Sequence, residues 1–186
     1  MLGQEEVAYL RELIDREKIR DCLQRYCVGA DRCDVEMLSS TYWPDAHDIH
    51  GDFDGSGEDF IKWVIPGLKN LVCTQHFMGN SLIRIDGKFA NVETYMRNWH
   101  TLQDENGQKS DLIHGGRYLD KFEKRNDEWR VIDRLVMFDF VLENPTTAEF
   151  ADGCLGQKNI PVSTRFPDDA QYRFHGGFSV GGYLGK

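Results

Sequence analysis

Two short segments carry the residues best suited to chemistry. Residues 26–31 read Tyr-Cys-Val-Gly-Ala-Asp, and residues 74–80 read Thr-Gln-His-Phe-Met-Gly-Asn. Each places one proton-handling side chain, Asp31 or His76, in an otherwise largely apolar stretch. A carboxylate and an imidazole that face one dry pocket form a general acid/base pair, which takes a proton from carbon and delivers one to a leaving group.

His76 suits the role of base because an imidazole has a reference pKa of about 6.5 and exchanges protons near neutral pH. The Asp31 carboxylate would hold its tautomer and stabilise the imidazolium. The hydroxyl of Tyr26, on the same predicted helix as Asp31, would orient a substrate oxygen. Two simpler interpretations stay open from the residues alone: Asp31 as a solvated turn residue at a helix end, and His76 as a hydrogen-bonded core histidine.

Other histidines occur on neighbouring predicted strands. His100 and His114 follow apolar residues, and the sequence leaves open whether each points into the pocket or away from it. A metal site could be built from His47, His50 and Asp48. Positions i and i+3 of a strand face opposite sides, however, so one surface would not present both histidines. We therefore expect no metal.

Motifs that bind nucleotides or mark hydrolases are missing from the sequence. The chain has no GxGxxG, no P-loop, no GxSxG elbow and no HExxH. The glycines cluster in turns and in the C-terminal region. We therefore expect no nucleotide, flavin, nicotinamide or other cofactor.

Composition excludes several classes of partner. The 186 residues are enough for one domain with a substantial core, and acidic and basic residues are interspersed within a net charge of −9. No Lys/Arg cluster could follow a phosphate backbone, and no apolar run reaches membrane-spanning length. We expect neither nucleic acid nor membrane as a partner. Five cysteines without CxxC spacing and an acidic N-terminus without signal-peptide features predict reduced thiols and a cytoplasmic protein.

Helices are predicted in the first third of the chain. Apolar residues at steps of three and four predict an amphipathic helix over about residues 5–30. Asp34 can cap a second helix that carries Val35, Leu38 and Tyr42 and stops before Pro44. Ser56 starts a third helix, which Pro66 kinks or ends.

After Asn70 the pattern changes to strands. Asp86-Gly87 and Asn126-Asp127 are turn signals between long strands. Four such strands in a row form an antiparallel meander, with a short strand ahead of them at residues 45–50. The class is α+β: a strongly curved sheet with helices across its concave face, which would enclose one pocket. The strands are predicted at about residues 72–85, 89–102, 109–124 and 128–140.

The last part of the chain, residues 143–186, shows neither the apolar period of a helix nor that of a strand. Prolines and glycines interrupt it, yet it holds many apolar residues. We expect an extended arm that packs on the body, residues 1–142, or on a neighbouring subunit. Such residues exposed on a monomer would form a larger patch than soluble monomers usually carry, which favours a homo-oligomer. The apolar residues are Phe150, Leu155, Ile160, Phe166, Phe174 and Phe178.

Three segments resemble the SnoaL-like branch of the nuclear transport factor 2-like superfamily. They are residues 19–32, which end in Gly-Ala-Asp-Arg, residues 42–46 (Tyr-Trp-Pro-Asp-Ala), and residues 74–80 around His76. The meander from residue 116 to residue 131 is also typical, and the resemblance covers about residues 8–142. It implies a cone of curved antiparallel sheet with three N-terminal helices, the cystatin-like α+β barrel. It also favours a trimer, with a dimer as the alternative.

The scytalone dehydratase, hexachlorocyclohexane dehydrochlorinase and bile-acid 7α-dehydratase members of this family use an Asp–His pair at positions that match Asp31 and His76. The resemblance implies a cofactor-free lyase or isomerase for a small hydrophobic, polycyclic or aromatic-like substrate. Tyr26 and His100 would assist catalysis. Two alternatives stay open: a non-catalytic β subunit of an aromatic-ring-hydroxylating dioxygenase, and a ligand-binding module without turnover. We expect the substrate to contact His50, Trp63, Phe77, Trp99 and Phe138.

Overall fold

The structure is a computed structural model that describes residues 2–148 and 162–173. The predictions for Phe150, Leu155, Ile160, Phe174 and Phe178 concern residues outside these ranges. No helix in the described ranges has the length and apolar character needed to cross a membrane.

The first helix, α1 (Gln4–Arg32), ends where the candidate acid lies. Its C-cap, Cys33, adopts the left-handed conformation (φ 54°), and its N–H bonds back to the carbonyl of Ala30. Helix α2 (Val35–Ser39) follows at once, capped by the Asp34 side chain, which accepts from the N–H of Met37. Gly29 permits this tight packing, because a Cβ there would lie 2.7 Å from the backbone nitrogen of Leu38.

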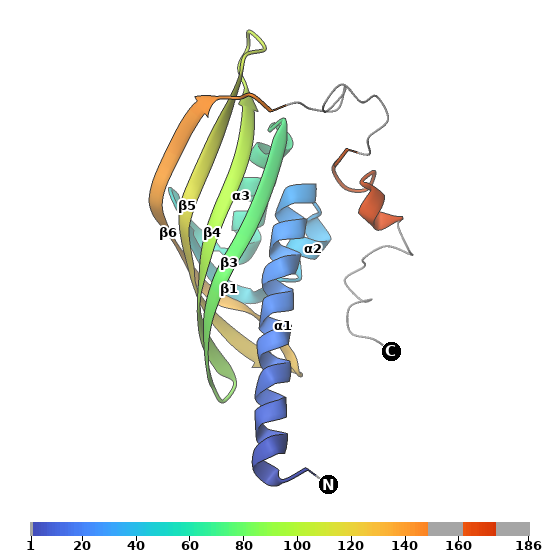
Figure 1. Cartoon of the computed structure of the whole chain (residues 1–186), viewed down its shortest axis with the longest axis vertical. Coiled ribbons are helices and arrows are strands. Elements are labelled where there is room, and N and C mark those ends of the chain that lie inside the picture. Colours follow the sequence, from blue (N-terminus) through green and yellow to red (C-terminus); the bar gives the residue numbers. More distant parts are fainter. Residues whose placement is uncertain (1, 149–161, 174–186) are drawn as a thin grey trace.

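Helix α1 is longer than its buried part. Its second half is buried from Ile19 to Asp31, whereas its first half is mostly exposed. In Figure 1 this half extends along the open lower end of the sheet. The predicted apolar face is therefore only partly buried, and exposed apolar side chains on the first half include Tyr9, Leu10, Leu13 and Ile14.

Helix α3 (Gly57–Lys69) has an apolar face that packs toward the sheet. Ser56 caps it by accepting from the N–H of Asp59. Pro66 lies inside the last turn, and the helix continues past it to Lys69. The prediction that Ser56 starts this helix is confirmed, and the helix ends beyond the proline rather than at it.

Six strands form one curved sheet in the order β2-β1-β6-β5-β4-β3. The predicted meander of four antiparallel strands is confirmed, with β6 running past residue 140 to Pro145. Strand β1 pairs in parallel with β6, and the short β2 was not predicted. The bounds are β1 Tyr42–His50, β2 Phe53–Ser56, β3 Cys73–Asp86, β4 Phe89–Gln103, β5 Lys109–Arg125 and β6 Glu128–Pro145.

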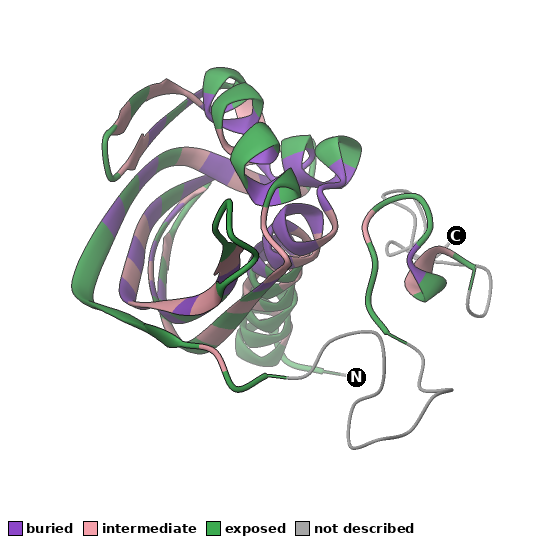
Figure 2. Cartoon of the chain, turned by 90° about the horizontal axis from the view of Figure 1, so that it is seen from above, coloured by how far each residue is buried: buried purple, intermediate pink, exposed green. Residues whose placement is uncertain are grey.

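The helices cover the concave side of this sheet. Figure 2 shows the strands curving around the buried faces of the helices, with an open edge between the two ends of the sheet. The core lies between the layers and includes Tyr118, Phe122, Trp129, Phe60 and Ile19, each almost completely buried. The fold is the predicted α+β cone, a curved and unclosed sheet with three helices.

Part of the region after β6 lies against the end of α1. The backbone N–H of Phe166 donates to the carbonyl of Arg32 at 2.7 Å, and the hydroxyl of Tyr172 donates to Asp34 Oδ2 at 2.9 Å. Arg165 is the main polar anchor of this segment. Its guanidinium donates to the backbone carbonyls of Asp31, Leu68 and Leu71, and so joins the C-terminal ends of α1 and α3.

Candidate active site

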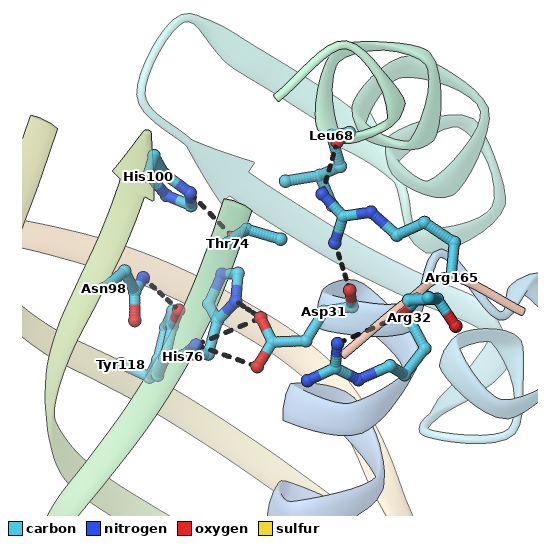
Figure 3. A network of polar contacts seen from close by, with 10 residues as sticks. Asp31, Arg32, Leu68, Thr74, His76, Asn98, His100, Tyr118 and Arg165 are labelled. Carbon is cyan, nitrogen blue, oxygen red and sulfur yellow. Dashed lines mark hydrogen bonds and ion pairs between the residues drawn. The ribbon is translucent and has the colours of Figure 1, made fainter. Parts of the chain in front are cut away.

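The structure brings Asp31 and His76 into direct contact. Nδ1 of His76 lies 2.6 Å from Oδ1 of Asp31, and the backbone N–H of His76 lies 3.0 Å from each carboxylate oxygen. Figure 3 shows both groups of contacts between the end of α1 and strand β3. The carboxylate therefore fixes the main chain and the ring of one residue together.

This pair is shielded from solvent. The side chains of His76 and Asp31 are only 7% and 9% exposed. With Nδ1 donating to the carboxylate, the neutral ring keeps its acceptor lone pair on Nε2, which is the arrangement of a general base. Asp31 is therefore not a solvated turn residue. The other simpler interpretation, a hydrogen-bonded core histidine, agrees with this contact, and His76 differs from such a residue in that it also lines a cavity.

His100 lies next to His76, with ring centroids 5.5 Å apart. Thr74 Oγ1 lies 2.7 Å from Nδ1 of His100. Burial, reinforced by the nearby His76 and His114, lowers the pKa of His100 to about 3. The pKa of His114 is lowered as well, mainly by burial. Both rings are therefore neutral near pH 7 and serve as hydrogen-bonding groups rather than as cations.

Tyr26 lies on the other side of His76, with ring centroids 6.2 Å apart. Burial raises its pKa well above the ordinary value, so it is a neutral phenol. Asn98 donates to the hydroxyl of Tyr118 at 3.1 Å, a second polar contact at the base of the pocket. Figure 3 shows it beside the pair.

Arg134 is completely buried beneath Tyr26. It forms a two-point ion pair with Asp120, at 2.7 and 2.8 Å. Its guanidinium also lies 4.2 Å and 4.4 Å from the ring centroids of Tyr26 and Tyr118. Both side chains are completely buried, so this ion pair lies in the core and not at the surface of the sheet.

His76, the member of the pair that is not on α1, lines a cavity of about 260 Å³. A cavity of this size fits a ligand of roughly one or two fused rings, below the usual range for drug-sized ligands. Three of the predicted contact residues line it: His50, Trp63 and Phe138. The other lining residues are Tyr26, Ala30, Leu38, Gly51, Asp52, Phe60, Val64, Leu68, His76, Asn98, His100 and His114.

The prediction that Phe77 and Trp99 contact the substrate is wrong. Neither lines the cavity, and their side chains are 66% and 40% exposed. Each is the immediate strand neighbour of an inward-facing histidine. Since successive side chains of a strand point to opposite faces, both must lie on the outer face of the sheet.

Several residues of the site were not predicted. Asn98 and His114 face the cavity, and the period of two along β4 and β5 could have placed them there. Asp52 also lines it, from the turn after β1. Arg165 holds the main chain at Asp31 from a distant part of the chain, and no local pattern marks such a contact.

His47 lies away from the cavity. Its ring contacts Asp54 at 2.8 Å and Asp133 at 3.3 Å on the exposed side of β1. The hydrogen bond to Asp54 is the main reason why the pKa of His47 is raised. Within residues 2–148 and 162–173, no group of three or more His, Cys, Asp or Glu side chains is placed to hold a metal ion.

Comparisons with known proteins add sequence and structural relatives. An uncharacterised protein of Mycobacterium tuberculosis is 28% identical over 127 residues, 67% of this chain and 85% of its own. A crystal structure of a hexachlorocyclohexane dehydrochlorinase of type 2 matches with a TM-score of 0.66 at 19% identity, over 76% of this chain and 96% of its own.

A protein from Novosphingobium aromaticivorans, named as a candidate scytalone dehydratase, matches with a TM-score of 0.64 at 21% identity, over 74% of this chain and 92% of its own. At these identities, the structural likeness shows the fold alone. The family model of the SnoaL-like domain matches residues 11–134 of this chain. This range includes Asp31, His76 and every strand from β1 to β5. The chain therefore belongs to the SnoaL-like domain family.

Proposed function

We propose that this protein is a cofactor-free lyase or isomerase of the dehydratase type. Its substrate is a small hydrophobic alcohol or ketone with one or two rings. The observation that carries the proposal is the shielded contact between Asp31 and His76 at the edge of an aromatic cavity. The similarity to dehydratase-type and dehydrochlorinase proteins supports the same class of reaction.

His76 Nε2 takes a proton from the carbon next to the substrate carbonyl. The electron pair of the broken C–H bond forms the new C=C bond, and the C–O bond of the hydroxyl at the next carbon breaks. The C–O electron pair leaves with the hydroxyl oxygen, which takes up a proton and departs as water. Asp31 stabilises the resulting imidazolium through its contact with Nδ1. Isomerisation begins with the same proton transfer and ends with protonation at another carbon.

The neighbouring groups hold the carbonyl oxygen. Tyr26 is a neutral phenol and His100 a neutral imidazole, and each supplies a hydrogen-bond donor as negative charge develops on this oxygen. The cavity lining is largely aromatic and apolar, and no lysine or arginine among the described residues lines it. Both conditions strengthen these hydrogen bonds.

A bicyclic β-hydroxy ketone tests the proposal. Removal of water from 3-hydroxy-1-tetralone gives 1-naphthol, whose fluorescence reports turnover directly. Wild-type protein should form 1-naphthol, and His76→Gln should reduce the rate by about 10²–10⁴-fold. His47→Gln is the matched control, because His47 also contacts aspartates but lies outside the cavity.

Near-normal turnover in His76→Gln would reject this mechanism. Binding of the ketone without turnover would instead favour a ligand-binding module. Co-purification with a larger iron-containing chain would favour a dioxygenase β subunit, the other alternative.

A further inference from the structure

A closed circuit of aromatic ring contacts joins six residues that line the cavity with Tyr118, which lies behind them. Consecutive ring centroids lie 5.3–6.4 Å apart all the way round. In order, the rings belong to His76, His100, His114, Phe138, His50, Tyr118 and Tyr26.

His50 stands across this circuit from His76. One path between them passes through Tyr26 and Tyr118, and the other passes through two histidines and Phe138. Both histidines line the cavity. A ligand between them therefore presents one side to each imidazole.

His50 is paired with Asp48, as His76 is paired with Asp31. Its Nδ1 lies 3.5 Å from Oδ1 of Asp48, and the Asp48 side chain is completely buried. Both atoms are buried, and neither has a hydrogen-bond partner in the described ranges. A buried polar atom without a partner costs free energy, so the two atoms are best satisfied by each other through a proton on Nδ1. This leaves Nε2 as the nitrogen that faces the cavity.

The second carboxylate oxygen of Asp48 is hydrogen-bonded as well. This oxygen, Oδ2, accepts from the hydroxyl of Tyr42 at 2.6 Å, and that hydroxyl accepts from Arg134 at 3.2 Å. The buried guanidinium therefore reaches Asp48 through one phenol. A buried charge persists where it is paired and hydrogen-bonded in this way.

The ring of His50 is also fixed in orientation. It stacks on Phe60, with centroids 4.7 Å apart and planes inclined by 17°. His100 and His114 have no carboxylate among their nearest polar contacts, and burial keeps them neutral. Of the histidines around the cavity, only His50 and His76 are paired with an aspartate among the described residues.

We propose that His50, oriented by Asp48, is the second acid/base residue of this pocket, opposite His76, and that it holds and protonates the oxygen that leaves the substrate. The proposal rests on the proposed function in one respect, that a carbon–oxygen bond breaks here. The proton on Nε2 of the His50 imidazolium passes to the departing oxygen and gives water. His76 meanwhile keeps the proton taken from carbon, and exchange with solvent resets both rings.

An oxyanion probe tests this site without turnover. The probe is 4-nitrophenol, whose phenolate and phenol forms differ in colour. Wild-type protein should bind the phenolate, and loss of one charge-assisted hydrogen bond should weaken binding by about 10–100-fold in His50→Gln. His50→Phe, which preserves the stack on Phe60, should weaken binding in the same way. Because it leaves Oδ1 of the buried Asp48 without its partner, its thermal melting temperature should fall, and binding is compared at a temperature at which circular dichroism shows every variant folded.

Asp48→Asn tests the positioning role. Without the carboxylate, the group that orients His50 and stabilises its imidazolium is lost, so the pH dependence of phenolate binding should differ from that of the wild type. If Asp48 had only a structural role, Asp48→Asn would weaken phenolate binding equally at every pH. His47→Gln, on the same strand and outside the cavity, should bind as the wild type does.

The outcomes separate the two proposals. If neither His50 variant weakens phenolate binding, or if the wild type binds no phenolate, the role of His50 is rejected whatever happens to His76. If phenolate binding depends on His50 but no hydroxy ketone is dehydrated, the acid site stands and the proposed function falls.

Discussion

Asp31 binds the main chain and the side chain of His76 at once. The backbone N–H and Nδ1 of His76 both contact its carboxylate, at 3.0 and 2.6 Å. The contact links the last turn of α1 to strand β3 across 45 positions of sequence. The residue that stabilises the protonated ring therefore also holds the strand that carries this ring.

Asp31 and His76 are expected to act as one unit. Asp31→Asn keeps the shape of the side chain but removes the charge that stabilises the imidazolium. Each single variant should lose about 10²–10⁴-fold in turnover of the hydroxy ketone, and the double variant should lose little more. Losses that multiply in the double variant would show that the two residues act independently.

Stability should fall toward acid pH because of His100. Its pKa is about 3 in the folded protein and about 6.5 in the unfolded chain, so in this window the unfolded chain binds a proton that the folded protein excludes. The free energy of unfolding should decrease as the pH falls from about 6.5 to about 3, by at most ~1.4 kcal/mol per pH unit from this residue. Above that window His100 has no such effect.

Denaturant titrations at several pH values measure the slope of the free energy of unfolding against pH. His100→Asn should flatten it relative to the wild type. His47→Gln should not flatten it, because the pKa of His47 is raised: its stabilising contribution is present below its ordinary pKa and is lost as the pH rises. Equal slopes in the wild type and His100→Asn would contradict the burial of a neutral imidazole.

Much of this site could be predicted from the sequence. Asp31 comes at the end of a periodic helix and His76 within a strand, and short local patterns define both. The wrong contacts, Phe77 and Trp99, came from sequence proximity, whereas the period of two of a strand sends the neighbour of an inward residue outward. Once the side chains of His76 and His100 are assigned to the concave face of the sheet, those of Phe77 and Trp99 are assigned to the outer face.

Other features depend on contacts that local patterns do not encode. The ion pair of Arg134 and Asp120 joins different strands in the core, and only the sheet register shows that it is buried. The role of Asp48 beside His50 depends on the side chain of Tyr42 and on Arg134 behind it. The contact between Arg165 and Asp31 spans 134 positions and follows an irregular segment.

Arg165 is expected to stabilise the site from outside. Its guanidinium donates to the carbonyls of Asp31, Leu68 and Leu71, which lie at or just beyond the C-terminal ends of α1 and α3. Arg165→Ala should lower the free energy of unfolding by about 1–3 kcal/mol. Arg173→Ala is the control, because the exposed Arg173 contacts only a carbonyl of its own segment. Chemical denaturation measures both, and equal effects would contradict the anchoring role.

Turnover should not depend on a metal. The proposed steps use only side-chain proton transfers, and no described cluster is placed to bind a metal. Extensive dialysis against a chelator should leave the rate of 1-naphthol formation unchanged, and elemental analysis should find no stoichiometric transition metal. A loss of rate that added zinc or iron restores would overturn the cofactor-free mechanism.

The outer face of the sheet is expected to form a homo-oligomer contact. Phe77, Tyr95 and Trp99 are 66%, 51% and 40% exposed there, and Phe140 lies in the same cross-strand row as Phe77, through Arg97 and Gly115. Several exposed aromatic side chains on one face of a sheet are typical of subunit interfaces. We expect a trimer, with a dimer as the alternative.

Light scattering with aspartate substitutions tests this surface. Phe77→Asp and Trp99→Asp should each shift the protein toward the monomer, because an interface would have to bury an unpaired carboxylate. Leu10→Asp is the control, since Leu10 is a similarly exposed apolar residue on the first half of α1. A chain that ends at Pro145 separates the two possible contacts: an unchanged mass assigns the assembly to the sheet face, and a monomer assigns it to the C-terminal region. A monodisperse full-length monomer would reject the oligomer itself.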